Sequence, residues 1–202
     1  MTARNIGTLD RRAAVAALLQ DRGALLVVTG LGSPSYDVYA AGDHPGNFYL
    51  WGAMGGAALT AFGLALAQPR RPVVAITGDG EQLMGLGGLA TIAAKRPGNL
   101  TVVVLDNGHF GETGMQLSHS GLGVDLHRIA AATGFAEAVE LHDLAAVADY
   151  RPTLQRLDGG PRFATLRIAP GNPERALPAR DGVFVKNRFR AHLGFRVPGD
   201  IA

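Results

Sequence analysis

The clearest signal of the fold is the segment Ala75-Ile76-Thr77-Gly78-Asp79-Gly80-Glu81. An apolar run ends here in two glycines around an acid, and helix-forming residues follow at once. A buried strand that leads directly into a turn and a helix is typical of a parallel sheet. The glycines permit a tight turn and a close approach of phosphate to the free amides at the helix start. The junction is therefore predicted to bind an anion.

A second polar junction, Leu105-Asp106-Asn107, ends the next predicted strand, and Asn107 stands 28 positions after Asp79. The two strands belong to one βαβ unit, so both junctions emerge at the same edge of the sheet, about 4.8 Å apart. Asp79 by itself would repel a phosphate, so a cation between them is expected. Mg²⁺ takes a few protein oxygens and completes its shell with phosphate and water.

The rest of the chain alternates in the same way. Six strands are predicted, at 24–29, 48–50, 72–77, 100–105, 135–140 and 163–168. Helices are predicted at 10–20, near Tyr36, and at 54–67, 81–95, 125–133 and 143–156, with a long loop at 107–124. This pattern predicts an α/β fold: an open, mostly parallel six-stranded sheet with helices on both faces. Residues 1–170 form the predicted domain. The Pro-rich piece 170–178 is expected to detach a basic tail, 171–202, that contacts another subunit.

Composition excludes several classes of protein. The chain has 202 residues, of which 47% are apolar and 18% charged, as expected of one compact domain. A net charge of +2 with scattered Lys and Arg argues against nucleic acid, and the absence of Cys, with no signal peptide, fits the cytoplasm. The uncharged stretch Pro45–Pro69 is long enough for a membrane span. Its five glycines favour a strand, a turn and a buried helix, so no membrane segment is expected.

Gly78-Asp79-Gly80 followed by Asp106-Asn107 resembles the signature of thiamine diphosphate enzymes. The resemblance implies that Mg²⁺ is held by Asp79, Asn107 and the main-chain carbonyl of His109. It also places Gly80 and Glu81 beside the diphosphate of the cofactor.

Trp51-Gly52-Ala53-Met54-Gly55 also resembles this family. The implied roles are that the Gly52 carbonyl accepts a hydrogen bond from the cofactor's 4'-amino group and that Met54 supports its bent shape. A lone Met most often fills space in a hydrophobic core. The cofactor role of Met54 is therefore inferred only from the residues around it that resemble the family. The turn Thr29-Gly30-Leu31-Gly32-Ser33 lies on the same edge of the sheet. Gly32 and Ser33 either touch the diphosphate or belong to a plain strand-to-helix turn.

The chain resembles the family's diphosphate-binding domain and leaves no room for a pyrimidine-binding one. The activating Glu is therefore expected from a separate pyrimidine-binding partner subunit, in a hetero-oligomer. The loop 107–116, together with Asn47-Phe48-Tyr49 and Thr29-Gly30, resembles the sulfopyruvate and phosphonopyruvate decarboxylases, the former as a β subunit. The implied reaction is decarboxylation of a small 2-oxo acid, similar to 3-sulfopyruvate or 3-phosphonopyruvate, to an aldehyde and CO₂.

Glu112 departs from this pattern, because an acid is unexpected beside a pocket for a second anionic group. It is either a proton donor in catalysis or a solvated loop acid, and Thr113 beside it is a further catalytic candidate. Three alternatives remain open. The chain is a carboligase subunit, a non-catalytic cofactor-binding or scaffold subunit, or an unrelated nucleotide-binding protein. The third alternative is weakened because the chain has neither phosphate-loop motif, GxxxxGK[ST] or a GxGxxG at the first strand turn.

Overall fold

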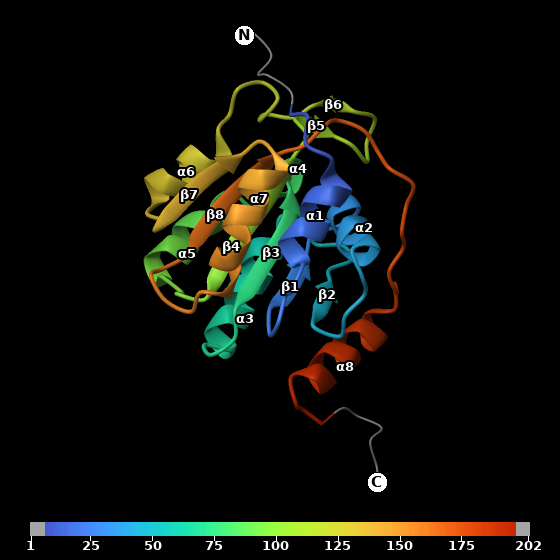
Figure 1. Cartoon of the computed structure of the whole chain (residues 1–202), viewed down its shortest axis with the longest axis vertical. Coiled ribbons are helices and arrows are strands. Elements are labelled where there is room, and N and C mark those ends of the chain that lie inside the picture. Colours follow the sequence, from blue (N-terminus) through green and yellow to red (C-terminus); the bar gives the residue numbers. More distant parts are fainter. Residues whose placement is uncertain (1–6, 197–202) are drawn as a thin grey trace.

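The computed structural model describes residues 7–196. Six parallel strands form one sheet in the order β2-β1-β3-β4-β8-β7 (Figure 1). They are β1 (Leu26–Thr29), β2 (Asn47–Tyr49), β3 (Val73–Gly78), β4 (Leu100–Asp106), β7 (Glu137–Leu141) and β8 (Arg162–Arg167). The predicted six-stranded sheet of an α/β fold is confirmed, and its strands are all parallel.

Helices cover both faces of this sheet (Figure 1). One layer holds α1 (Arg11–Leu19), α2 (Ser33–Ala40) and α7 (Leu144–Tyr150), which a 3₁₀ turn, Arg151–Gln155, continues. The other layer holds α3 (Ala57–Ala67), α5 (Gly88–Lys95) and α6 (Leu126–Thr133). Successive side chains of a strand point to opposite faces, so Val74 and Ile76 pack into the first layer and Val73 and Ala75 into the second. Burial on both faces explains the unbroken apolar runs.

The strand order places a crevice at the carboxyl edge of the sheet. β1 and β3 are neighbours, but the chain continues from β1 to the outer strand β2 and from β3 in the opposite direction to β4. Ligands of open α/β sheets bind where the strand order reverses in this way. The short helix α4 (Asp79–Met84) begins at this edge, directly after β3. The fold therefore puts Asp79 at the switch point.

Most predicted boundaries differ from the structure by one or two residues, and three predicted segments differ in kind or by more than that. The helix expected at 81–95 is two helices, α4 and α5, because the backbone at Gly85 packs so closely on Gly55 that a Cβ would lie 2.2 Å from the Gly55 carbonyl oxygen. The helix expected at 54–67 begins at Ala57, which leaves Met54 in an irregular turn. The expected loop 107–124 contains a hairpin of β5 (His109–Phe110) and β6 (Gln116–Leu117).

The expectation that residues 170–178 detach the tail from the core is wrong. After β8 the chain runs along the α1 and α2 side of the molecule and then forms α8 (Gly182–His192) (Figure 1). Phe189 of α8 is 6% exposed, and its ring meets that of Phe48 edge-on at 5.5 Å. Arg188 pairs with Asp43 at 2.6 Å. Val185 and Phe189, four positions apart, are the buried residues of α8, and the basic residues around them obscure this helical spacing in the sequence. Contact of 171–202 with another subunit stays a prediction.

Within residues 7–196, no helix is both long and apolar enough to cross a membrane. The uncharged stretch Pro45–Pro69 instead holds β2, an irregular turn and the eleven-residue helix α3.

Candidate active site

Asp79 and Asn107 come together at the ends of neighbouring strands. In the pairing of β3 with β4, Gly78 lies opposite Leu105, so the residues that follow them leave the sheet side by side. Asp79 is 3% exposed and Asn107 is 8% exposed. Two polar side chains at adjacent strand ends are thus buried at the switch point, as the sequence predicts from the parallel arrangement.

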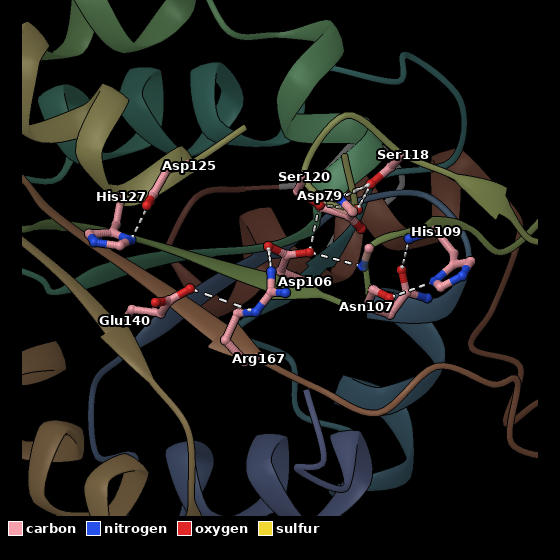
Figure 2. A network of polar contacts seen from close by, with 12 residues as sticks. Asp79, Asp106, Asn107, His109, Ser118, Ser120, Asp125, His127, Glu140 and Arg167 are labelled. Atoms are coloured by element: carbon pink, nitrogen blue, oxygen red, sulfur yellow. Dashed lines mark hydrogen bonds and ion pairs between the residues drawn. The ribbon is translucent and has the colours of Figure 1, made fainter. Parts of the chain in front are cut away.

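Two serine hydroxyls contact the Asp79 carboxylate (Figure 2). Ser118 Oγ donates to Asp79 Oδ2 at 2.5 Å, and Ser120 Oγ lies 2.9 Å from the same oxygen. Ser120 Oγ is also 2.7 Å from Asp106 Oδ1, yet a hydroxyl has only one proton to donate. The two carboxylates therefore compete for it. Burial, and after it the charge of Asp106, raise the pKa of Asp79 to about 6 against the opposing hydrogen bonds from the serines.

Asp106 holds the end of β4 in place. One of its oxygens pairs with Arg167 of β8, and the other accepts from the backbone N–H of Gly108 at 3.0 Å. Arg167 also faces Glu140 of β7 at 3.6 Å, so this ion network ties three neighbouring strands together (Figure 2). Both Asp106 and Arg167 are almost fully buried. The charge of Asp106 is thus balanced within the chain, whereas no described cation pairs with Asp79.

Asn107 and His109 form a compact turn after β4. The backbone N–H of His109 donates to Asn107 Oδ1 at 2.8 Å, and His109 Nδ1 lies 2.7 Å from the Asn107 carbonyl oxygen. A carbonyl can only accept, so Nδ1 carries the proton. Gly108 between them has φ +70°, which favours glycine. The His109 side chain thereby orients the backbone of the turn, while its own carbonyl is the predicted metal ligand.

The hairpin β5–β6 lies against the start of α4. A Cβ at Gly80 would come within 2.8 Å of the Phe110 ring, so only glycine allows this approach. Glycine at position 80 therefore has a packing role besides the predicted approach of phosphate. The hairpin brings its tip over the predicted site.

A pocket at this edge gathers most of the predicted residues. Nine of them line it: Ser33, Met54, Asp79, Gly80, Glu81, Asn107, His109, Glu112 and Thr113. Gly32 and Gly52 do not line it. Gly32 lies under Glu112 with φ +76°, and Gly52 belongs to the irregular turn that carries Met54. Their predicted contacts to the cofactor stay predictions, as do those of the nine.

The Glu81 side chain is buried beneath the turns that precede α2 and α3 and is shielded from open solvent. It is 4% exposed, and a Cβ at Gly30 would lie only 1.8 Å from its Oε2. Burial raises the pKa of Glu81, while Thr77 and the amides of Ala57, Gly55 and Leu31 lower it. Neither carboxylate oxygen has a well-formed hydrogen bond among the described residues. Glu81 thus lies buried between the turns that precede α2 and α3.

Sequence reasoning missed three residues of this site. Ser118 and Ser120 lie about 40 positions from Asp79, and their signal was only a polar Ser-His-Ser in a loop. Arg11 of α1 lines the pocket, but it stood in a segment predicted only as a charged helix start. Its guanidinium is buried and pairs with Asp37 at 2.6 Å.

The donor set fits a hard cation held together with a phosphate. A carboxylate, an amide oxygen and a carbonyl are the ligand types of Mg²⁺, and the chain has no Cys for a softer metal. In residues 7–196 no group of three or more His, Asp or Glu side chains is arranged to hold a metal. The three predicted protein oxygens would leave the rest of an octahedral Mg²⁺ shell to a diphosphate and water.

Comparison with known proteins gives the family. Residues 34–165 match the thiamine pyrophosphate enzyme, C-terminal TPP binding domain. The chain belongs to this family. It is 38% identical over 175 residues to the sulfopyruvate decarboxylase subunit beta of Methanothermobacter thermautotrophicus, a match that covers 87% of the chain and 89% of that subunit. The chain therefore has the thiamine pyrophosphate-binding domain, and the matched region includes Asp79 and Asn107.

Two further proteins that the chain resembles are longer than the chain itself. The phosphonopyruvate decarboxylase of Streptomyces viridochromogenes is 41% identical over 172 residues, which are 83% of the chain but 42% of that enzyme. The solved structure of a putative thiamin diphosphate-dependent enzyme from Mycobacterium smegmatis superposes with a TM-score of 0.66 at 25% identity over 84% of the chain, and this is 33% of that protein. The domain is thus one part of longer chains in these relatives and most of a subunit in the first.

Proposed function

We propose that this chain is the diphosphate- and Mg²⁺-binding subunit of a thiamine diphosphate-dependent 2-oxo acid decarboxylase. The observation that carries the proposal is the meeting of Asp79 and Asn107 at adjacent strand ends, inside a pocket that Met54 and Ser33 also line. The names of the two curated relatives, both 2-oxo acid decarboxylases, support the reaction.

In this proposal the chain's own residues hold the metal and the cofactor. Asp79, Asn107 and the carbonyl of His109 bind Mg²⁺, while Ser33 and the amide at Gly80 face the diphosphate. The raised pKa of Asp79 reflects a buried negative charge that the described residues leave unbalanced, and a bound cation would balance it. Thiamine diphosphate, once bound, supplies the electron sink that decarboxylation of a 2-oxo acid requires.

The proposal includes a separate partner subunit that binds the pyrimidine and supplies the activating Glu. Met54 is 48% exposed beside the pocket, and Met84 and Leu59, on neighbouring elements, are 65% and 40% exposed. Gly55, which follows Met54, packs on Met84, and Gly88, four positions after Met84, packs on Leu59, so the three exposed side chains lie on segments that contact one another. Exposed apolar areas of this kind mark interaction sites. The area adjoins the pocket, where the missing half of the active site has to dock.

The substrate is proposed to be a small 2-oxo acid with a second anionic group, as the names of the relatives indicate for those enzymes. The test is to combine the chain with its partner subunit, Mg²⁺ and thiamine diphosphate, and to measure CO₂ from a panel of 2-oxo acids. CO₂ with an aldehyde one carbon shorter is expected, and it should disappear when either subunit or Mg²⁺ is omitted. Products longer than the substrate without free aldehyde would instead show carboligation. No turnover of any 2-oxo acid would contradict the proposal.

A further inference from the structure

Glu112, the acid that the decarboxylase pattern does not explain, is not alone at the rim of the pocket. Its Oε1 accepts from Ser33 Oγ at 3.2 Å, and its Oε2 pairs with Arg175 Nη2 at 3.1 Å. The Glu112 side chain is 42% exposed and that of Arg175 is 64% exposed. An ion pair this open to water is held weakly. Another anion can therefore replace Glu112 as the partner of Arg175.

The backbone around Arg175 is held more firmly than its side chain. Arg12 donates to the carbonyl oxygen of Glu174. Asn172 Nδ2 donates to the carbonyl oxygen of Gly111 at 3.2 Å, so the segment is tied to the tip of the hairpin. The guanidinium itself lies over the Tyr36 ring, 5.8 Å from its centre. These contacts keep Arg175 at the pocket rim whichever anion it binds.

The other guanidiniums near this rim have buried partners. Arg11 and Arg12 both pair with Asp37, at 2.6 and 2.9 Å, and the Asp37 side chain is 2% exposed. Releasing either of them would leave a buried charge with less compensation. Among these ion pairs, the carboxylate partner of Arg175 is by far the most exposed, so Arg175 is the guanidinium that another anion can reach most easily.

We infer that Arg175 is a specificity-determining residue that binds the second anionic group of the substrate, a sulfonate or phosphonate, and that Glu112 is the internal anion it exchanges. This inference rests on the proposed function. A planar guanidinium fits two oxygens of a tetrahedral anion at once, which an ammonium group does not. The exchange also gives Glu112 a role. Its carboxylate neutralises Arg175 until a substrate with a second anionic group binds.

The experiment uses the complex of both subunits with Mg²⁺ and thiamine diphosphate. The ratio of kcat/KM for 3-sulfopyruvate to that for 2-oxobutyrate, which carries a methyl group in place of the sulfonate, is measured first. Arg175→Gln should lower this ratio by about 10- to 100-fold, as expected for one charge-assisted contact. Most of the loss should lie in the KM for 3-sulfopyruvate. Arg128→Gln is the matched control, because Arg128 is 80% exposed and pairs with Asp125, the N-cap of α6, and neither residue lines the pocket.

A binding measurement separates substrate recognition from a structural role. By calorimetry, 3-sulfopropionate, which has both anionic groups but no reactive carbonyl, is compared with butyrate. Arg175→Gln should weaken 3-sulfopropionate only, whereas Glu112→Gln should strengthen it several-fold by removing the competing carboxylate. If Arg175 only anchors its segment through Glu112, both variants will change binding in the same direction. That result, or equal binding of the two ligands by the unaltered complex, would overturn the inference. Failure of the proposed function would appear separately, as no CO₂ from any 2-oxo acid.

Discussion

Replacing Asp79 by Asn should make the cofactor-free chain more stable and at the same time remove its Mg²⁺-dependent hold on the cofactor. The amide keeps an oxygen that accepts from Ser118 and Ser120, so the local hydrogen bonds survive. What disappears is a negative charge that is 3% exposed and next to Asp106. The same charge is the one proposed to bind the metal.

The magnitude follows from the pKa of Asp79, which is about 6 in the folded chain against an ordinary value of 3.8 for an aspartate. A pKa raised on folding means that the folded state binds the proton more tightly, so the chain loses stability as pH rises from about 4 to about 6. Above that range the loss is complete. Two pKa units correspond to about 3 kcal/mol, which is the order of stabilisation expected for Asp79→Asn at pH 7.5. The gain should shrink as pH falls through 6 and vanish near pH 4.

Urea denaturation of the isolated chain at pH 7.5, 6 and 4.5 measures this gain. Asp158→Asn is the control, because the Asp158 side chain is 87% exposed. Cofactor retention is measured by gel filtration of the two-subunit complex with and without Mg²⁺. A lower free energy of unfolding for Asp79→Asn at pH 7.5 would refute the argument about burial. Undiminished Mg²⁺-dependent retention would refute the role of Asp79 as a metal ligand.

Three further substitutions test other parts of the site and fold. Gly80→Ala should lower the free energy of unfolding by about 1–3 kcal/mol and weaken cofactor retention, because the added Cβ meets the Phe110 ring at 2.8 Å. Adding Phe110→Ala should restore retention, and a double variant without restored retention would count against the steric reason. Ser118→Ala should raise the pKa of Asp79 further, because it removes a hydrogen bond to the carboxylate. More of Asp79 is then protonated at pH 6 than at pH 8, so Mg²⁺-dependent cofactor retention should fall more at pH 6. Equal losses at the two pH values would contradict this. Phe189→Ala should lower the free energy of unfolding in urea by about 3–5 kcal/mol, whereas a detached tail would give almost no change.

Much of the fold could be predicted because its signals are local. The apolar run before Gly78 and the glycines around Asp79 mark a buried strand and a tight turn within a few residues. Parallel strands share one edge, so the pattern also predicted that Asp79 and Asn107 would meet, although they are 28 positions apart. Helix boundaries were less predictable. The break between α4 and α5 depends on the packing of Gly85 against Gly55, which is a contact between distant segments.

The parallel sheet, the edge that carries the site and the meeting of Asp79 and Asn107 there all follow from local patterns in the sequence. The hydrogen-bond and charge partners of the site residues depend instead on the packing of distant segments. Ser118 and Ser120 reach Asp79 through the folding back of a hairpin, and Arg175 reaches Glu112 across 63 positions. The physical reason is that strand and turn patterns repeat over short distances, whereas a side chain's electrostatic partners depend on which segments the complete fold brings together.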